Sequence, residues 1–150
     1  RVSRMLKLLA AGNPACITVT LLDGIVVARS AFNSSMNYRS VVILGTAEKV
    51  TGEDKKIALD AFTEHLIPGR TQDIRASKPK ELAATTVVRF SLDEASVKVS
   101  EGPPSDEKSD YESDVWAGVI PLALESGEPQ SDPRLKSGIP VPPYIQKRKT

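Results

Sequence analysis

Residues 32–45 read FNSSMNYRSVVILG: amides, hydroxyls and one guanidinium stand directly ahead of an apolar, β-branched run. Such a run predicts a buried strand. The opening residues 1–14, RVSRMLKLLAAGNP, place Ser3 and Arg4 at the start of a short helix. Polar groups at these two places suit a phosphate-bearing ligand, whereas a hydrophobic core does not need them.

The opening helix carries its own start and stop signals. The Ser3 hydroxyl is predicted to cap the helix by accepting a hydrogen bond from a first-turn amide. Gly12 supplies a left-handed end, and Pro14 forbids continuation. The free amides of such a helix start favour an anion, and the planar fork of Arg4 suits phosphate. The alternative is an ordinary cap beside a solvated arginine.

Two β-branched segments follow, and Asp23-Gly24 lies between them. Asp-Gly between strand-like runs is a strong signal for a tight hairpin, so we expect strands over residues 15–22 and 24–31.

A longer strand is predicted over residues 38–50, after a polar loop at 33–37. Gly45 interrupts this strand and predicts a bulge or a close approach. The remaining strands are expected over residues 86–92, 95–100 and 115–124, with Pro121 confining the last to an edge or to the strand's end.

Helical periodicity appears over residues 53–67, where Leu59, Phe62 and Leu66 share one face and Thr51 is a plausible cap. A second, shorter helix is predicted over residues 79–84 because proline stands in its first turn. The acidic residues 102–114 predict a surface loop without metal-site spacing.

Sequential antiparallel strands with a few helices predict a mainly β fold, a small barrel or an α+β roll. No G-x-G-x-x-G or Walker loop is present, so a nucleotide would not be bound in the Rossmann manner. We expect one domain over residues 1–126 and an extended, proline-rich arm over 127–150 that ends in a basic tail.

Composition excludes several classes of function. The net charge of +1 gives no support for bulk binding to nucleic acid or membrane, and no apolar run is long enough for a bilayer. Cys16, the single cysteine, is expected to be an inert core residue of a protein from the reducing cytoplasm. Because the chain begins with Arg1 in what looks like the middle of a domain, we expect its true N-terminus to be absent.

Several blocks, in order, resemble the FMN-binding split-barrel proteins related to pyridoxamine 5′-phosphate oxidase. They are SRMLKLLAAGNPACITVTLLDG, SAFNSSMNYRSVVILG, EHLIPGR, EASVKVSEGPP, VWAGVIPL and DPRL-x-x-GIPVP-x-Y, which together cover nearly the whole chain. The resemblance implies a split β-barrel that acts as a homodimer, with FMN at the subunit interface. It also implies that strands preceding the Ser3-Arg4 helix are absent from this chain.

The same resemblance assigns residues to the flavin. Ser3 and Arg4 match a pair that holds the FMN phosphate, and Trp116 matches a tryptophan that lies against the cofactor from the partner subunit. Arg39-Ser40 stands where the family has Arg-Gln, whose longer glutamine contacts the ring. The remaining implied contacts are Asn37 and Tyr38, which flank that position, and, as weaker matches, Ser96 and Lys98.

Two departures from the family pattern bear on function. Ser40 is shorter than the glutamine, and Asn33 stands where close relatives often have histidine. Each implied site residue also has a structural interpretation: Trp116 as a core or interface residue, and Arg39 as the partner of a carboxylate. His65, the one histidine, is expected to stabilise the end of its helix and not to act in catalysis.

The resemblance therefore implies an FMN-dependent oxidoreductase that acts on a small organic substrate. No metal is expected, because the carboxylates of residues 102–114 lack metal-site spacing. The catalytic residues and the substrate are not identified by the sequence. Pyridoxamine-phosphate oxidase activity itself is less expected, because the substrate-phosphate residues have no clear match. The alternatives are a nitroimidazole-reductase-like protein and a non-catalytic flavin- or heme-binding dimeric barrel.

Overall fold

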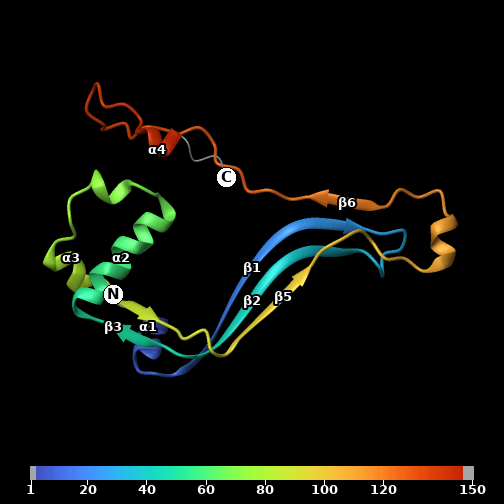
Figure 1. Ribbon diagram of the computed structural model, residues 1–150, viewed down its shortest axis with the longest axis horizontal. Helices are drawn as coiled ribbons and strands as arrows, with labels where there is room; N and C mark the ends of the chain where they lie inside the picture. The colour runs from blue at the N-terminus through green and yellow to red at the C-terminus, as the bar shows by residue number, and fades with distance from the viewer. Residues whose placement is uncertain (1–2, 147–150) are drawn as a thin grey trace. The chain divides into compact units, whose positions relative to one another are not determined.

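The computed structural model describes residues 3–146. In this range the chain is mainly β, with six strands and a few short helices (Figure 1). It forms two compact units, each of which is described by itself. Unit 1 comprises residues 1–11, 48–89 and 124–150, and unit 2 comprises residues 12–47 and 90–123. The division predicted at residue 126 stays a prediction.

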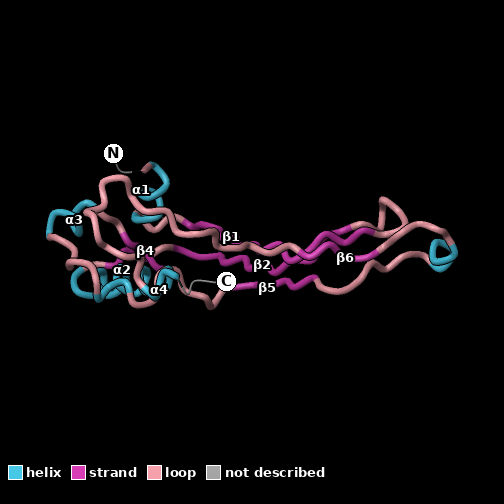
Figure 2. The backbone as a smooth tube through the Cα atoms, turned by 90° about the horizontal axis from the view of Figure 1, so that it is seen from above, coloured by secondary structure: helices cyan, strands magenta, loops and turns pink. Residues whose placement is uncertain are grey.

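Unit 2 is built on one four-stranded antiparallel sheet in the order β5-β2-β1-β6. The strands β1, β2 and β5 run side by side in both views (Figure 1 and Figure 2). The sheet is open, with β5 and β6 at its edges. The elements of this unit are β1 (Pro14–Val27), β2 (Ser35–Thr46), β5 (Ala95–Ser100), η2 (Lys108–Glu112) and β6 (Gly118–Pro121).

The hairpin predicted at Asp23-Gly24 is wrong, because β1 runs through this dipeptide as one strand. The register against β2 shifts between Leu22 and Gly24, so Asp23 is the extra residue of a β-bulge. Gly24 is needed for a close approach: a Cβ atom there would lie 2.9 Å from the Val119 side chain of β6. Pairing with β6 therefore keeps this segment extended where local turn propensity favoured a hairpin.

The bulge predicted at Gly45 is also wrong. The β1–β2 ladder continues through Gly45, which lies opposite Ala15, without a shift in register. The long predicted strand instead divides at Ala47, a buried residue between β2 and β3 (Glu48–Val50).

Alternation along the strands gives the sheet of unit 2 two different faces. The polar face carries Thr18, Thr20, Tyr38, Ser40, Ser96, Lys98 and Ser100, together with Cys16, Leu22, Val42 and Leu44. The apolar face carries Ala15, Ile17, Val19, Leu21, Val41, Ile43, Ala95, Val97 and Val99, with Arg39 at one end. The apolar face is open to solvent, and Val97 is 70% exposed.

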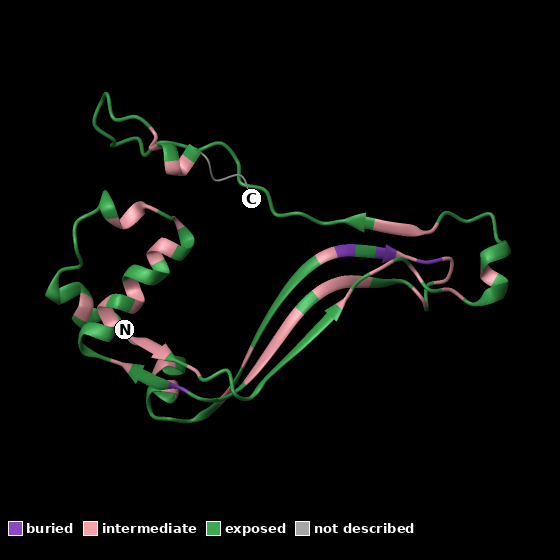
Figure 3. Cartoon of the chain, viewed as in Figure 1, coloured by how far each residue is buried: buried purple, intermediate pink, exposed green. Residues whose placement is uncertain are grey.

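Few residues of either unit are fully buried. Val26, Ala28 and Ala47 are the buried apolar residues among those described (Figure 3). Val26 and Ala28 lie at the end of β1, beside the ladder to β6. The packed centre of unit 2 is therefore at this end of its sheet.

Unit 1 combines short helices with a two-stranded sheet of β3 and β4 (Val87–Arg89). Its helices are α1 (Arg4–Ala10), α2 (Gly52–Leu66), η1 (Arg70–Gln72), α3 (Pro79–Ala84) and α4 (Pro143–Gln146). The predicted bounds of α3 and β5 are confirmed. Among residues 3–146, no helix has the length and apolarity to cross a bilayer.

The helix starts differ from the prediction in one respect. Ser3 and Thr51 occupy the N-cap positions of α1 and α2, but neither side chain makes a capping hydrogen bond.

The apolar face predicted for α2 is exposed on this unit, with Phe62 at 62%. The Lys55 ammonium of α2 donates to the Leu82 carbonyl of α3 at 2.5 Å.

The proline-rich arm is attached to unit 1 by α4, which the sequence did not predict. The Tyr144 hydroxyl donates to Asp73 at 2.5 Å and accepts a hydrogen bond from Arg70 at 3.0 Å. The Tyr144 ring lies against Gly69, whose φ of 88° requires glycine. The predicted basic tail, residues 147–150, lies outside the described residues.

Candidate functional site

One rung of the polar face in unit 2 brings predicted site residues together. Ser40 on β2 is directly opposite Thr20 on β1 and Lys98 on β5. The Thr20 and Ser40 hydroxyls are hydrogen-bonded at 2.8 Å. The Lys98 ammonium lies over the Tyr38 ring, 5.8 Å from its centroid. This cluster of hydroxyls, a cation and an aromatic ring can bind a polar, planar ligand.

Asn37 and Arg39 lie on the opposite face, because side chains alternate along β2. The Asn37 amide donates to the Gly102 carbonyl at 3.0 Å. Arg39 forms a bidentate ion pair with Asp23, the residue of the bulge, at 2.8 and 2.9 Å. This hydrogen bond lowers the pKa of Asp23 and raises the pKa of Arg39. The four consecutive site residues expected along β2, residues 37–40, are therefore divided between two faces, and Ser96 and Lys98 of β5 share the face of Tyr38 and Ser40.

Trp116 precedes β6 in unit 2 and is 65% exposed. Its indole lies so close to Gly118 that a Cβ atom there would be 2.9 Å from the ring. The ring is thus held against its own chain with most of its surface open, which leaves it available for stacking.

The loop that leads to Trp116 is fastened to the end of β1. Asp106 accepts the Arg29 backbone N–H at 3.0 Å and the Arg29 guanidinium at 3.1 Å. The Asp106 side chain is 0% exposed, so the prediction that this loop carries only solvated carboxylates is wrong at this residue. The Tyr111 ring covers the guanidinium, 4.8 Å from its carbon. The loop is an anchored element of unit 2.

Ser3 and Arg4 belong to unit 1. Both are exposed at the start of α1. Among residues 3–146 the Arg4 guanidinium makes no ion pair with a carboxylate, so its fork is open for an anion.

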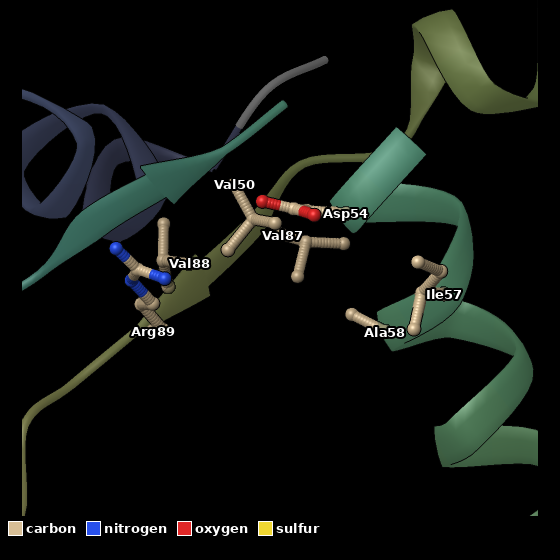
Figure 4. A pocket seen from close by; sticks show the side chains of 7 residues that line it. All are labelled: Val50, Asp54, Ile57, Ala58, Val87, Val88 and Arg89. Atoms are coloured by element: carbon tan, nitrogen blue, oxygen red, sulfur yellow. The ribbon is translucent and has the colours of Figure 1, made fainter. Parts of the chain in front are cut away.

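Each unit also contains a shallow hollow. In unit 1 a hollow of about 430 Å³ lies between the β3–β4 sheet and α2 (Figure 4). Its lining residues are Val50, Asp54, Ile57, Ala58, Val87, Val88 and Arg89. In unit 2 a hollow of about 200 Å³ adjoins the polar face and is lined by Val42, Leu44, Asp93, Glu94, Ala95 and Ser96. The weakly matched Ser96 thus lines the hollow of unit 2.

Cys16 is exposed and free, so its predicted core position is wrong. The predicted cytoplasmic location stays a prediction. His65 lies in the last turn of α2, as expected for a residue that stabilises a helix end. Within the described part of the chain, no three His, Cys, Asp or Glu side chains gather as a possible metal site.

Sequence reasoning missed Thr20 and Asp23. Both contacts depend on the register of β1 against β2, which the predicted hairpin would have changed. Alternation along a continuous β1 would have placed Thr20 on one face with Thr18 and Leu22, but its position opposite Ser40 requires the register.

Comparison with known proteins supports the resemblance. The family model described as pyridoxamine 5′-phosphate oxidase matches residues 1–99. The solved structure of the FAD and heme binding protein from Mycobacterium smegmatis is 45% identical, with a TM-score of 0.93, over 98% of this chain and 73% of that one. The flavocytochrome Anf3 from Azotobacter vinelandii is 44% identical, with a TM-score of 0.89, over 97% and 68% respectively.

A comparison with curated protein sequences gives no match. The family model nonetheless covers about two-thirds of the chain, and the two solved structures share its fold at more than 40% identity. On these grounds the chain belongs to the pyridoxamine 5′-phosphate oxidase family and has its mainly β fold.

Proposed function

We propose that this chain is a flavin-binding protein whose ligand is FMN. The resemblance implies that Ser3 and Arg4 bind the phosphate of FMN; within unit 2, Tyr38, Ser40 and Lys98 are the proposed contacts of the ring. Trp116 is a further proposed contact, whereas Asn37 and Arg39 lie on the face of the sheet opposite Ser40 and Lys98 and are not proposed as contacts of the same ring. The observation that carries the proposal is the rung of polar groups that joins Ser40 to Thr20 and Lys98 on one face. The names of the two solved structures, an FAD and heme binding protein and a flavocytochrome, support a flavin.

The donor chemistry of these residues fits a flavin nucleotide. The open guanidinium of Arg4 suits a phosphate dianion. The hydroxyls of Thr20 and Ser40 and the ammonium of Lys98 provide donors and acceptors for a heteroaromatic ring. The exposed indole of Trp116 offers an aromatic surface for stacking. Arg39 fits less directly, because two of its nitrogens are engaged by Asp23.

The proposed activity is that of an FMN-dependent oxidoreductase acting on a small organic substrate. A bound flavin supplies the redox chemistry, and the chain supplies anchoring, orientation and hydrogen bonds to the ring. Anaerobic addition of NAD(P)H to the flavin-loaded protein tests this activity. Loss of the visible flavin bands is expected of a reductase, and a nitroimidazole would then be tested as the electron acceptor. Bands that persist with every donor would indicate a non-catalytic flavin carrier.

Heme binding is a second candidate, favoured by the names of both solved structures. Imidazole is a common axial ligand of heme iron, and His65 is the only histidine of the chain. Titration with hemin tests this candidate. A Soret band that disappears in His65→Ala would support it, and an unchanged spectrum of free hemin would contradict it.

We further propose that the chain acts as a homodimer. The resemblance implies a dimer with FMN at the subunit interface, and the 65% exposed Trp116 matches a residue that lies against the cofactor from the partner subunit. Sedimentation equilibrium is expected to give a dimer for the wild type. A monomeric wild type would contradict the proposal.

A further inference from the structure

The rung that contains Thr20, Ser40 and Lys98 differs from its neighbours on the polar face. The next rung in one direction contains Val42, and the next in the other direction contains Leu22. Only this rung of the three carries a hydrogen-bonding side chain on each of β1, β2 and β5. Adjacent strands are about 4.8 Å apart, so the three groups form a continuous polar row.

The two hydroxyls of the row act as a pair. Thr20 Oγ1 and Ser40 Oγ are 2.8 Å apart, so one O–H is used between them. The pair keeps one free O–H and several lone pairs, which lets it donate and accept side by side. Lys98 adds donors at the end of the row and accepts nothing.

This set complements the pyrimidine edge of a flavin ring, where two carbonyl oxygens flank one N–H. A serine hydroxyl alone can rotate freely and offers no fixed direction, because its hydrogen has several positions of similar energy. A neighbouring hydroxyl at hydrogen-bond distance reduces that freedom to two arrangements, in which either Thr20 or Ser40 is the donor.

We propose that Thr20 is a positioning residue of the flavin site: its hydroxyl restricts the direction of the Ser40 hydroxyl, so that Ser40 and Lys98 meet the polar edge of the ring. This inference rests on the proposed flavin function. No resemblance or comparison assigns Thr20, and its role follows from its register and from its bond to Ser40.

Binding of FMN and of riboflavin by the wild type, Thr20→Val and Thr20→Ser tests the inference. Valine keeps the shape of threonine without the hydroxyl, and serine keeps the hydroxyl. Thr20→Val is expected to weaken both ligands equally, by about five- to tenfold, which is the effect of one hydrogen bond. Thr20→Ser is expected to bind as the wild type does. The visible absorption maximum of the bound flavin should move in Thr20→Val only.

The matched control is Thr18→Val, on the same strand and face but opposite Val42 in place of a hydroxyl. In a Ser40→Ala background, Thr20→Val should have no further effect, because the hydroxyl that it positions is gone. Thermal unfolding of each apoprotein establishes that the variants are folded before their affinities are compared.

The outcomes separate the inference from the function on which it rests. Equal affinities of the wild type and Thr20→Val would overturn the inference and leave flavin binding intact. A loss confined to FMN would also overturn it, because the contact would then be with the phosphate. A wild type that binds neither ligand would overturn the proposed function, and the inference with it.

Discussion

Arg39 binds both carboxylate oxygens of Asp23, at 2.9 Å through Nε and at 2.8 Å through Nη2. Asp23 is the additional residue of the bulge in β1, and Arg39 lies on the neighbouring strand. The sequence alone left two partners open for the Arg39 guanidinium, a carboxylate or a ligand. The bulge provides the carboxylate. Arg39 thus has a carboxylate partner on the face opposite Ser40, which favours the structural interpretation of this residue.

The bulge also depends on the residue that follows Asp23. Gly24→Ala is expected to destabilise the protein by about 1–3 kcal/mol, the usual result of overpacking. The added Cβ would lie 2.9 Å from the Val119 side chain and 3.3 Å from the Ile120 carbonyl of β6. Urea unfolding measures the change. Gly127→Ala is the control, since a Cβ atom there would meet nothing within 4 Å. Equal losses in both variants would contradict the close approach.

The anchored loop gives a second test. Asp106→Asn is expected to lower the free energy of unfolding by about 1.5–3 kcal/mol, the range for hydrogen bonds that involve a charged group. The Asp106 side chain is fully buried, and both of its oxygens are used by Arg29. Asp114→Asn is the control, because Asp114 is exposed in the same connection. If the Asp106→Asn protein were as stable as the control, the contact between Asp106 and Arg29 would contribute nothing to stability.

On the proposed function, Arg4 is expected to distinguish FMN from riboflavin, its dephosphorylated form. Arg4→Ala is expected to weaken FMN by about 1.5–3 kcal/mol, the cost of a lost charge-assisted hydrogen bond, and to leave riboflavin unchanged. Fluorescence titration of both ligands measures the difference. Lys7→Ala removes a cation from the same helix and should affect neither ligand strongly. FMN affinity equal to that of the wild type would contradict the phosphate role of Arg4.

The pair of Arg75 and Glu81 predicts a dependence of stability on pH. Hydrogen bonds from the Arg75 guanidinium and from the Lys78 backbone N–H lower the pKa of Glu81 from 4.5 to about 2. A carboxylate with a lowered pKa stabilises the folded state above its unfolded pKa and loses that contribution as the pH falls through its folded pKa.

The stability difference between the wild type and Glu81→Gln should therefore be constant above pH 4.5 and shrink from there towards about pH 2. Thermal unfolding across this range measures it, with Glu128→Gln in the exposed arm as the control. A stability difference that stays constant down to the lowest pH would show that folding does not lower the pKa of Glu81.

Local sequence patterns predicted the first and last residues of two elements, β5 and α3, correctly. In β5 apolar residues alternate with polar ones, and α3 begins with Pro79 in its first turn. The hairpin at Asp23-Gly24 failed because its signal is purely local. The ladder to β6, formed by residues distant in sequence, keeps that segment extended.

The candidate site shows the same difference between features that local sequence patterns predict and features that depend on strand pairing. That Tyr38 and Ser40 share a face could be read from their spacing, and Lys98 joins them once β5 is paired. Thr20 could not be found without the register of β1, and the burial of Asp106 required the fold of a loop that looks solvent-exposed in sequence.

The most direct test of the central proposal is the visible absorption spectrum of the 150-residue chain after addition of FMN and removal of unbound ligand by desalting. Flavin bands that remain with the protein are predicted. A colourless protein, with all added FMN in the small-molecule fraction, would contradict the proposal that this chain binds FMN.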